Sequence, residues 1–199
     1  KEKVRKIDED LSKLAPKFSQ NTLNSTNDFT YYIEDITELS GLPDMAKEQA
    51  AETAKKKKKG SGWMFTLQMP SYIPVMQYAD NRDLRKTLYK ARSKVSFGGK
   101  YDNQKIIKKI IALRYEKARI LGFEEYAEYT LQKRMAGSTA NVNKFLDRLY
   151  EVYYPAAKKE LEEVKDLARK DGVEDLQTWD SAYYSEKLKK QKFDFDQEE

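Results

Sequence analysis

Apolar residues recur at intervals of three and four along most of the chain, which is the spacing of amphipathic helices. We expect Pro16 to kink or end the first helix, because proline donates no backbone hydrogen bond. A polar break should follow at residues 24–28, and Pro155 should bend the longest helix. The pattern predicts helices over residues 1–18, 44–59, 80–97, 103–121, 123–135 and 138–170, and a last one capped by Thr178.

Two short segments have the character of strands instead. Phe29–Ile33 is rich in aromatic and branched residues, and Trp63–Gln68 alternates large apolar with other side chains at a period of two. We expect the two segments to pair. The predicted fold is therefore mainly α-helical, with a small antiparallel two-stranded β element. The helices differ in length and the strands interrupt their order, so a repeat solenoid is not expected.

The composition removes several kinds of chemistry. The 199 residues include no histidine and no cysteine. Imidazole is the commonest transition-metal ligand and the usual general base near neutral pH, while thiolates serve as nucleophiles and metal ligands. The chain therefore cannot form a Ser-His-Asp triad, a His-Glu-x-x-His zinc site, a cysteine metal site or a disulfide. We expect it to hold no cofactor of its own.

The positive charge of the chain is local. Its net charge of +5 comes from 38 basic and 33 acidic residues, and without the run Lys55–Lys59 both counts are 33. A surface that follows a nucleic-acid backbone needs a broader basic field, so we expect no nucleic-acid partner and interpret the run as a solvated helix end. One alternative stays open, an independent helical module that binds an acidic or nucleic-acid partner through these lysines and the tyrosines.

No apolar segment approaches the roughly 20 residues that cross a bilayer, so no membrane partner is expected. The segment Lys1–Asp10 alternates charges with Val4 and Ile7 and lacks the apolar core of a secretion signal, which favours a cytoplasmic location. The helical spacing of its apolar residues is present from the first turn, and no capping residue precedes it. We therefore expect the chain to be cut from a longer polypeptide.

Acidic and glycine-rich clusters are the obvious places to look for a site. The acidic clusters at 124–125, 160–163 and 194–199 fall in helix first turns, exposed faces or the tail, so we expect solvated surface. No segment matches a calcium-binding loop. The glycines at 60–62 and 98–99 lack the spacing of a phosphate-binding loop and are typical of helix ends. We predict no catalytic and no metal-binding residue.

The 14 tyrosines are the remaining candidates. Most should lie at the edges of buried helical stripes, because a tyrosine has an apolar body and a polar tip. Tyr183 and Tyr184, beside Trp179, could instead contact a peptide backbone through their hydroxyl groups. We take these two tyrosines as candidate substrate-binding residues, with simple packing as the alternative.

The order of several short motifs resembles the amino-terminal half of the thimet oligopeptidase family of zinc metallopeptidases. The bacterial oligopeptidase A and peptidyl-dipeptidase branches are the most similar. The motifs are Leu39-Ser40-Gly41-Leu42-Pro43, Gly62-Trp63, Thr66-Leu67-Gln68-Met69-Pro70-Ser71-Tyr72, Tyr78-Ala79-Asp80-Asn81-Arg82-x-Leu84-Arg85, Leu113-Arg114-x-Glu116-Lys117-Ala118, Leu121-Gly122-Phe123 and Trp179-Asp180-x-x-Tyr183-Tyr184-x-Glu186-Lys187.

The resemblance implies a division of labour. In that family two largely helical halves enclose a deep channel, and a His-Glu-x-x-His helix downstream of the matched region binds zinc. Residues 1–199 would then be a single helical, non-catalytic region that walls the channel for oligopeptide substrates. Its partner would be the remainder of the parent polypeptide, which carries the zinc, and the region alone would be inactive. A stripe from Val4 to Phe18, if left bare, would favour self-association.

Overall fold

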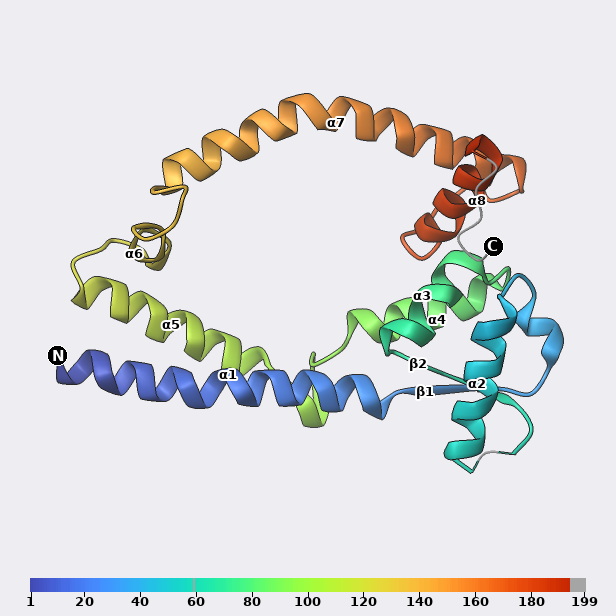
Figure 1. Cartoon of the computed structure of the whole chain (residues 1–199), viewed down its shortest axis with the longest axis horizontal. Helices are drawn as coiled ribbons and strands as arrows, with labels where there is room; N and C mark the ends of the chain where they lie inside the picture. Colours follow the sequence, from blue (N-terminus) through green and yellow to red (C-terminus); the bar gives the residue numbers. More distant parts are fainter. Residues whose placement is uncertain (59, 194–199) are drawn as a thin grey trace. The chain divides into compact units, whose positions relative to one another are not determined.

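The computed structural model describes residues 1–58 and 60–193. Its mainly helical fold with one two-stranded antiparallel sheet confirms the predicted class (Figure 1). Along the chain the elements are α1 (Glu2–Asp28), β1 (Thr30–Ile33), η1 (Ile36–Leu39), α2 (Asp44–Lys56), β2 (Trp63–Thr66), α3 (Met69–Tyr78), α4 (Arg82–Ser93), η2 (Gly99–Tyr101), α5 (Gln104–Ile120), α6 (Tyr126–Leu131), α7 (Thr139–Lys170) and α8 (Ser181–Phe193).

The chain divides into two compact units. Unit 1 contains residues 1–23 and 96–159, and unit 2 contains residues 24–95 and the segment from 160 onward. Two of the three boundaries fall inside the long helices α1 and α7, and the third, between residues 95 and 96, falls in the segment after α4. Whether residues 1–199 act as one region of a larger enzyme stays a prediction. Among the described residues, no helix has both the length and the apolar character that a membrane crossing requires.

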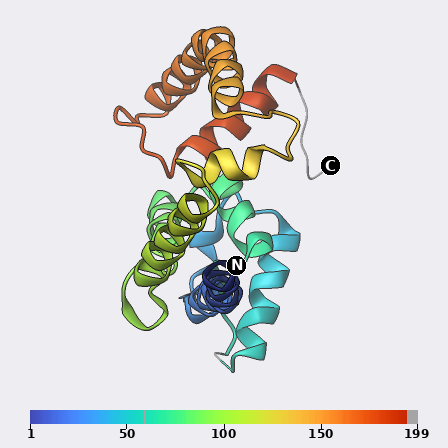
Figure 2. The same cartoon turned by 90° about the vertical axis from the view of Figure 1, so that its left-hand side faces the viewer.

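In unit 1, α5 lies alongside α1 (Figure 2). The buried Asn103, just before α5, donates a hydrogen bond from its amide nitrogen to the carbonyl of Phe18 (3.0 Å) and accepts one from Asn21 (2.9 Å). Further along the pair, the ammonium group of Lys117 lies 2.6 Å from the carboxylate of Asp8. These contacts fix how the two helices pack, because a buried amide must find partners for its polar atoms.

The apolar stripes of unit 1 are only partly covered. On α1, Ile7 is buried and the other stripe positions from Val4 to Phe18 are half-buried, so this stripe is not bare. On α5, Ile106 and Ala118 are buried, whereas Ile111 is exposed. Self-association of the chain stays a prediction, but α1 does not supply the bare surface that the sequence suggested for it.

The predicted end of the first helix is wrong. Pro16 lies inside α1, and the helix continues to Asp28 through the residues that were expected to form a polar break. A proline removes only its own N–H donor, and the helix on either side keeps its other hydrogen bonds. Thr26 is buried, so packing in unit 2 stabilises a polar segment of weak helix propensity.

In unit 2, β1 and β2 pair in antiparallel fashion, which confirms the predicted pairing. Thr30 lies opposite Thr66, and Ile33 lies opposite Trp63. Gly62, just before β2, allows the approach of the two strands, because a Cβ there would lie 2.4 Å from the carbonyl oxygen of Ile33. Only glycine fits at this position without movement of the backbone.

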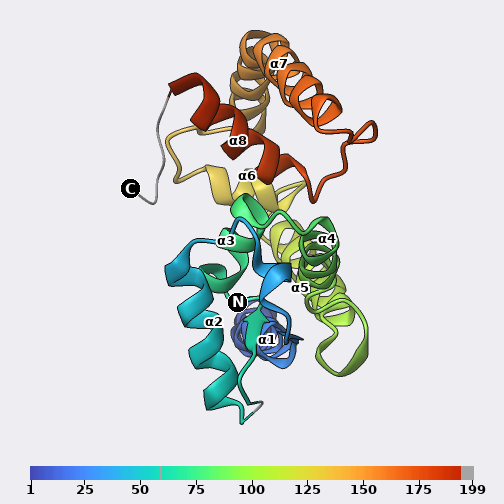
Figure 3. The same ribbon diagram turned by 90° about the vertical axis from the view of Figure 1, so that its right-hand side faces the viewer.

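The main core of unit 2 lies between the sheet and the helices α2, α3 and α4 (Figure 3). A second, smaller cluster joins the end of α7 to α8, which also packs on α3. The main cluster contains Ile33, Leu39, Leu42, Ala50, Phe65, Val75, Ala79, Leu84 and Leu88, and the second contains Val164, Leu167, Ala168 and Tyr184.

Several helix boundaries differ from those predicted. Helix α6 is shorter than the predicted 123–135, and α8 begins at Ser181 after a turn that includes Thr178, so Thr178 is not its cap. In contrast, the hydroxyl of Ser138 accepts a hydrogen bond from the N–H of Asn141 (3.2 Å), which confirms the predicted cap of α7. Boundaries differ because caps depend on local hydrogen bonds that apolar spacing does not encode.

Candidate functional site

A buried carboxylate in the interior of unit 2 is paired with two arginines. Asp180, directly before α8, is 0% exposed. It accepts hydrogen bonds from Arg82 (Nη2, 2.7 Å), from Arg85 (Nη2, 2.8 Å) and from the N–H of Gln177 (3.1 Å). Both of its oxygens are therefore occupied. A buried charge is tolerated only when it is paired and hydrogen-bonded in this way.

The pairing keeps Asp180 ionised. Burial on its own would raise the pKa of this carboxyl, but the hydrogen bonds from Arg82 and Arg85 outweigh it, and the pKa is lowered from its ordinary value. The hydrogen bond to Asp180 raises the pKa of Arg82 in turn. Asp180 therefore has no proton to donate near neutral pH and serves as the counter-ion of the two arginines.

Arg85 connects this ion pair to the neighbouring turn. Its side chain is 2% exposed, and Nη1 donates to the carbonyls of Ala79 (2.6 Å) and Asp80 (3.3 Å). The guanidinium group lies over the ring of Tyr183, 4.2 Å from the ring centre. A planar group with several donors can make all of these contacts at once, which a lysine could not do.

Tyr183 belongs to a second chain of hydrogen bonds. Its hydroxyl donates to one oxygen of Asp80 (2.8 Å), and the hydroxyl of Ser40 donates to the other (2.6 Å). Burial and the bond to Asp80 raise the pKa of Tyr183 well above its ordinary value, so the phenol stays protonated. Gly41 is needed beside this chain, because a Cβ there would lie 2.2 Å from the carbonyl oxygen of Tyr78.

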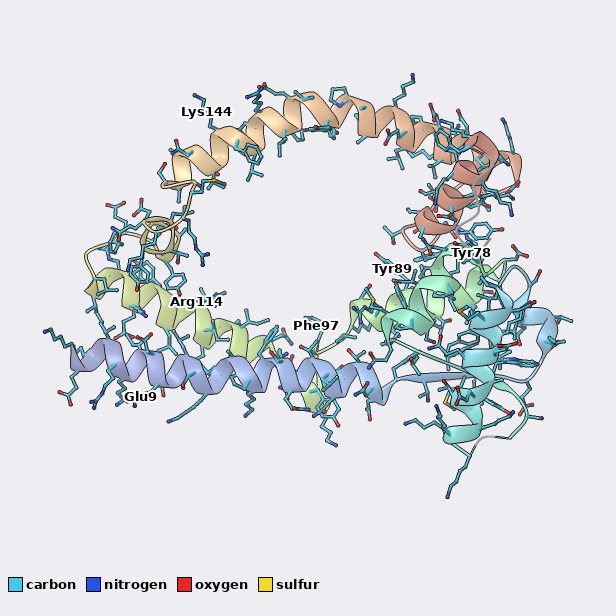
Figure 4. The ribbon with its side chains drawn as sticks, viewed as in Figure 1. Glu9, Tyr78, Tyr89, Phe97, Arg114 and Lys144 are labelled. Carbon is cyan, nitrogen blue, oxygen red and sulfur yellow. The ribbon has the colours of Figure 1, made fainter. Side chains whose placement is uncertain are left out.

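A pocket of about 310 Å³ opens beside Tyr183. Two of its charged side chains already have partners on neighbouring residues, since Glu186 pairs with Lys189 (3.2 Å) and Lys187 with Asp171 (2.5 Å). The mixture of acidic, basic and hydroxyl groups suits polar groups of either sign, such as those of a peptide backbone. The lining residues are Gly41, Gln77, Tyr78, Asp80, Tyr183, Glu186, Lys187 and Lys190, of which Tyr78 is labelled in Figure 4.

The two candidate tyrosines have different surroundings. Tyr184 is buried and packs with Val164, Leu167 and Ala168, with its ring edge-on to that of Tyr183. Only Tyr183 lines the pocket. A peptide-binding role for the pair stays a prediction, and in this arrangement Tyr183 would make the contact while Tyr184 would hold it in place.

Sequence reasoning missed the ion cluster itself. Arg85 and Asp180 are 95 positions apart, and no local pattern connects them. One signal was available, because Arg85 lies between Leu84 and Leu88 on the apolar face of α4, where an arginine requires a buried partner. The missing information was which of the chain's 33 acidic residues would be that partner.

The lysine run lies at the end of α2. Lys55 and Lys56 form its last turn, and Lys56 pairs with Glu52 one turn earlier (2.9 Å). Lysines in the last turn of a helix interact favourably with its dipole, which supports the interpretation as a solvated helix end. Lys59 and the acidic cluster at 194–199 lie outside the described residues.

The described side chains do not fit a metal ion. Within residues 1–58 and 60–193, no three histidine, cysteine, aspartate or glutamate side chains lie close enough together to hold one. Asp80 and Asp180 have their oxygens engaged by Tyr183 and Ser40 and by the two arginines. The arrangement therefore positions α3, α4 and α8 relative to each other, and it contains no activated nucleophile.

The ion cluster lies in a segment of the chain that matches a known protein family. The model of peptidase family M3 matches residues 75–199, which include Arg82, Arg85, Asp180 and Tyr183. This chain belongs to peptidase family M3. Oligopeptidase A of Haemophilus influenzae is 41% identical over 195 residues, and that of Escherichia coli is 40% identical; each alignment covers 95% of this chain and 28% of the relative.

A more distant relative of this M3 chain is the dipeptidyl carboxypeptidase of Escherichia coli, 25% identical over 199 residues, with 29% of the relative covered. The matches confirm the predicted resemblance to zinc oligopeptidases of the oligopeptidase A and peptidyl-dipeptidase branches. The M3 chain spans less than a third of the length of these relatives.

Proposed function

We propose that this chain is a non-catalytic part of a zinc oligopeptidase and forms part of the wall of its substrate channel. One observation carries the proposal. The chain aligns with oligopeptidase A over 95% of its own length yet covers 28% of that enzyme, and it contains no histidine. A member of a metallopeptidase family without imidazole ligands must leave zinc binding to another part of the polypeptide.

The proposal assigns three things to the parent enzyme. Zinc and peptide-bond hydrolysis belong to the remainder of the polypeptide, because the chain has no histidine or cysteine and no group of acidic side chains within residues 1–58 and 60–193 fits the ion. The substrates are oligopeptides, in keeping with the names of the relatives. The location is cytoplasmic. Within this division of labour, residues 1–199 act as one helical region that selects and positions substrate and breaks no bond itself.

We further propose that the pocket beside Tyr183 contributes to substrate binding. Its volume accommodates a small part of a peptide, and it offers groups of both charges. The phenol is held by Asp80 and covered on one face by Arg85, so its position is fixed before substrate arrives. Tyr184, packed behind it, would support this contact.

The test compares the chain with the parent enzyme. Both are incubated with a fluorogenic oligopeptide, with and without a zinc chelator, and their zinc content is measured. The parent should bind zinc and cleave the peptide in a chelator-sensitive manner, whereas the chain alone should do neither. Chelator-sensitive cleavage by the purified chain would overturn the proposal, and so would a parent enzyme that holds no zinc.

A further inference from the structure

The part of α7 within unit 1, residues 139–159, presents a stripe of apolar side chains that is largely uncovered in that unit. Val142 and Leu149 are half-buried, and the other apolar side chains between and after them are exposed. Apolar groups of this size are rarely gathered on one exposed helix face unless that face meets a partner. The exposed fractions are 61% for Phe145, 52% for Leu146, 61% for Val152 and 63% for Tyr153.

The same helix shows what a covered stripe looks like. Beyond residue 160 the apolar spacing continues through Val164, Leu167 and Ala168, and there all three side chains are buried, in a cluster with Tyr184 of α8. The apolar pattern is therefore the same along the whole helix, but burial is confined to the part that has a partner. The exposed part of α7 has the apolar pattern of a buried interface, but most of its apolar side chains have no second surface packed against them.

The spacing of the stripe indicates the shape of that second surface. Its positions advance by alternating steps of three and four from Val142 to Ala156, which is the repeat that packs lengthwise against another helix. At about 1.5 Å per residue this distance is about 21 Å, or roughly four helical turns. The spacing therefore suits an α-helix with an apolar stripe of similar length.

The two sides of the stripe differ in charge. Arg148 and Lys159 are eleven positions apart and lie along one edge, because eleven residues make close to three full turns. Along the other edge, Tyr150 and Tyr154 stack with their ring centres 4.6 Å apart. A helix that packs here would meet the basic edge best with acidic residues. Lys144, labelled in Figure 4, belongs to the opposite, polar face of α7.

We propose that this α7 stripe, the apolar residues from Val142 to Ala156, is the surface on which a helix from the remainder of the parent polypeptide packs. The inference rests on the proposed function, which makes this chain part of a longer enzyme. The relatives have more than three times the length that this chain covers, so ample polypeptide exists to supply the helix. A second copy of the chain is the competing occupant that the test must exclude.

The test uses paired variants in the parent enzyme and in this chain. Phe145→Asp together with Tyr153→Asp places two charges in the stripe, and Lys144→Glu together with Glu151→Lys changes the polar face without altering net charge. In the parent, the stripe variant should lower Tm by about 5 °C or more, because it buries charges in an apolar contact. In the isolated chain, where these side chains are exposed, neither variant should change Tm appreciably.

Radical footprinting of side chains gives a readout that does not depend on stability or activity. Phe145 and Tyr153 should be modified readily in the isolated chain and at least several-fold less in the parent. Equal modification in both, or a stripe variant without effect on the parent, would overturn the inference. So would dimerisation of the isolated chain that the stripe variant abolishes. Peptidase and zinc assays of the parent report separately on the proposed function.

Discussion

Replacement of Asp180 by asparagine should be the most damaging single polar substitution in unit 2. Asparagine keeps the size of the side chain but removes the charge that balances two guanidinium groups. The loss of the carboxylate would destabilise the two arginines to different degrees. The side chain of Arg82 is 41% exposed and can turn to water, whereas that of Arg85 is 2% exposed and would remain buried without a counter-ion.

The expected loss of stability follows from this difference in exposure between Arg82 and Arg85. Removal of one member of a buried ion pair costs about 3–5 kcal/mol, and an exposed pair contributes about 1 kcal/mol or less. Most of the loss in Asp180→Asn should therefore come from Arg85. We expect the free energy of unfolding to fall by about 3 kcal/mol at pH 7, measured by urea denaturation. The control is Glu162→Gln, which removes an exposed pairing with Lys165 and should change stability by about 0.5 kcal/mol or less.

The pH dependence supplies a second check. The pKa of Asp180 is lowered in the folded state, so its stabilising effect is complete above the ordinary value of 3.8 and is lost as the pH falls through the lower folded-state value. The difference between wild type and Asp180→Asn should be constant between pH 7 and pH 5, and it should shrink below about pH 4. A difference under about 1 kcal/mol at pH 7, or one that grows on acidification, would refute the reasoning.

Three further substitutions test separate features. Gly62→Ala should lower the free energy of unfolding by about 2–4 kcal/mol, because the new Cβ would meet the carbonyl of Ile33, and an equal stability would contradict the strand geometry. Asn103→Ala should lower the free energy of unfolding by about 1–3 kcal/mol, as measured by thermal unfolding, because it removes the buried amide that hydrogen-bonds to Phe18 and Asn21 of α1. Tyr183→Phe should cost about 1 kcal/mol through the lost bond to Asp80 and, in the parent enzyme, should raise KM for peptides more than it lowers kcat; an unchanged KM would argue against the pocket as a substrate contact.

Apolar spacing was sufficient to place most helices, and alternation at a period of two was sufficient to pair Trp63–Thr66 with the strand that ends at Ile33. Local propensity was misleading around Pro16, where tertiary packing carries α1 on to Asp28. The ion cluster was beyond local reasoning, because it brings together residues nearly one hundred positions apart. Family resemblance identified the motifs that contain these residues, but it did not say that they meet.

Periodicity also could not predict which of the apolar stripes would be buried. The same spacing of three and four describes the partly covered stripe of α1 and the exposed stripe of α7. Periodicity predicts that a face can be buried, but burial also requires a partner, and a partner can lie in another part of the polypeptide. The sequence of one helix therefore predicts an interface without saying which segment completes it.

Unit 2 is assembled from two stretches of chain, with residues 96–159 between them. During synthesis on the ribosome, Arg82 and Arg85 emerge long before Asp180 does. Arg85 therefore cannot be buried with its counter-ion until nearly one hundred further residues have been translated. The final closure of this unit is therefore a late, long-range step, and until then its apolar side chains remain exposed to aggregation.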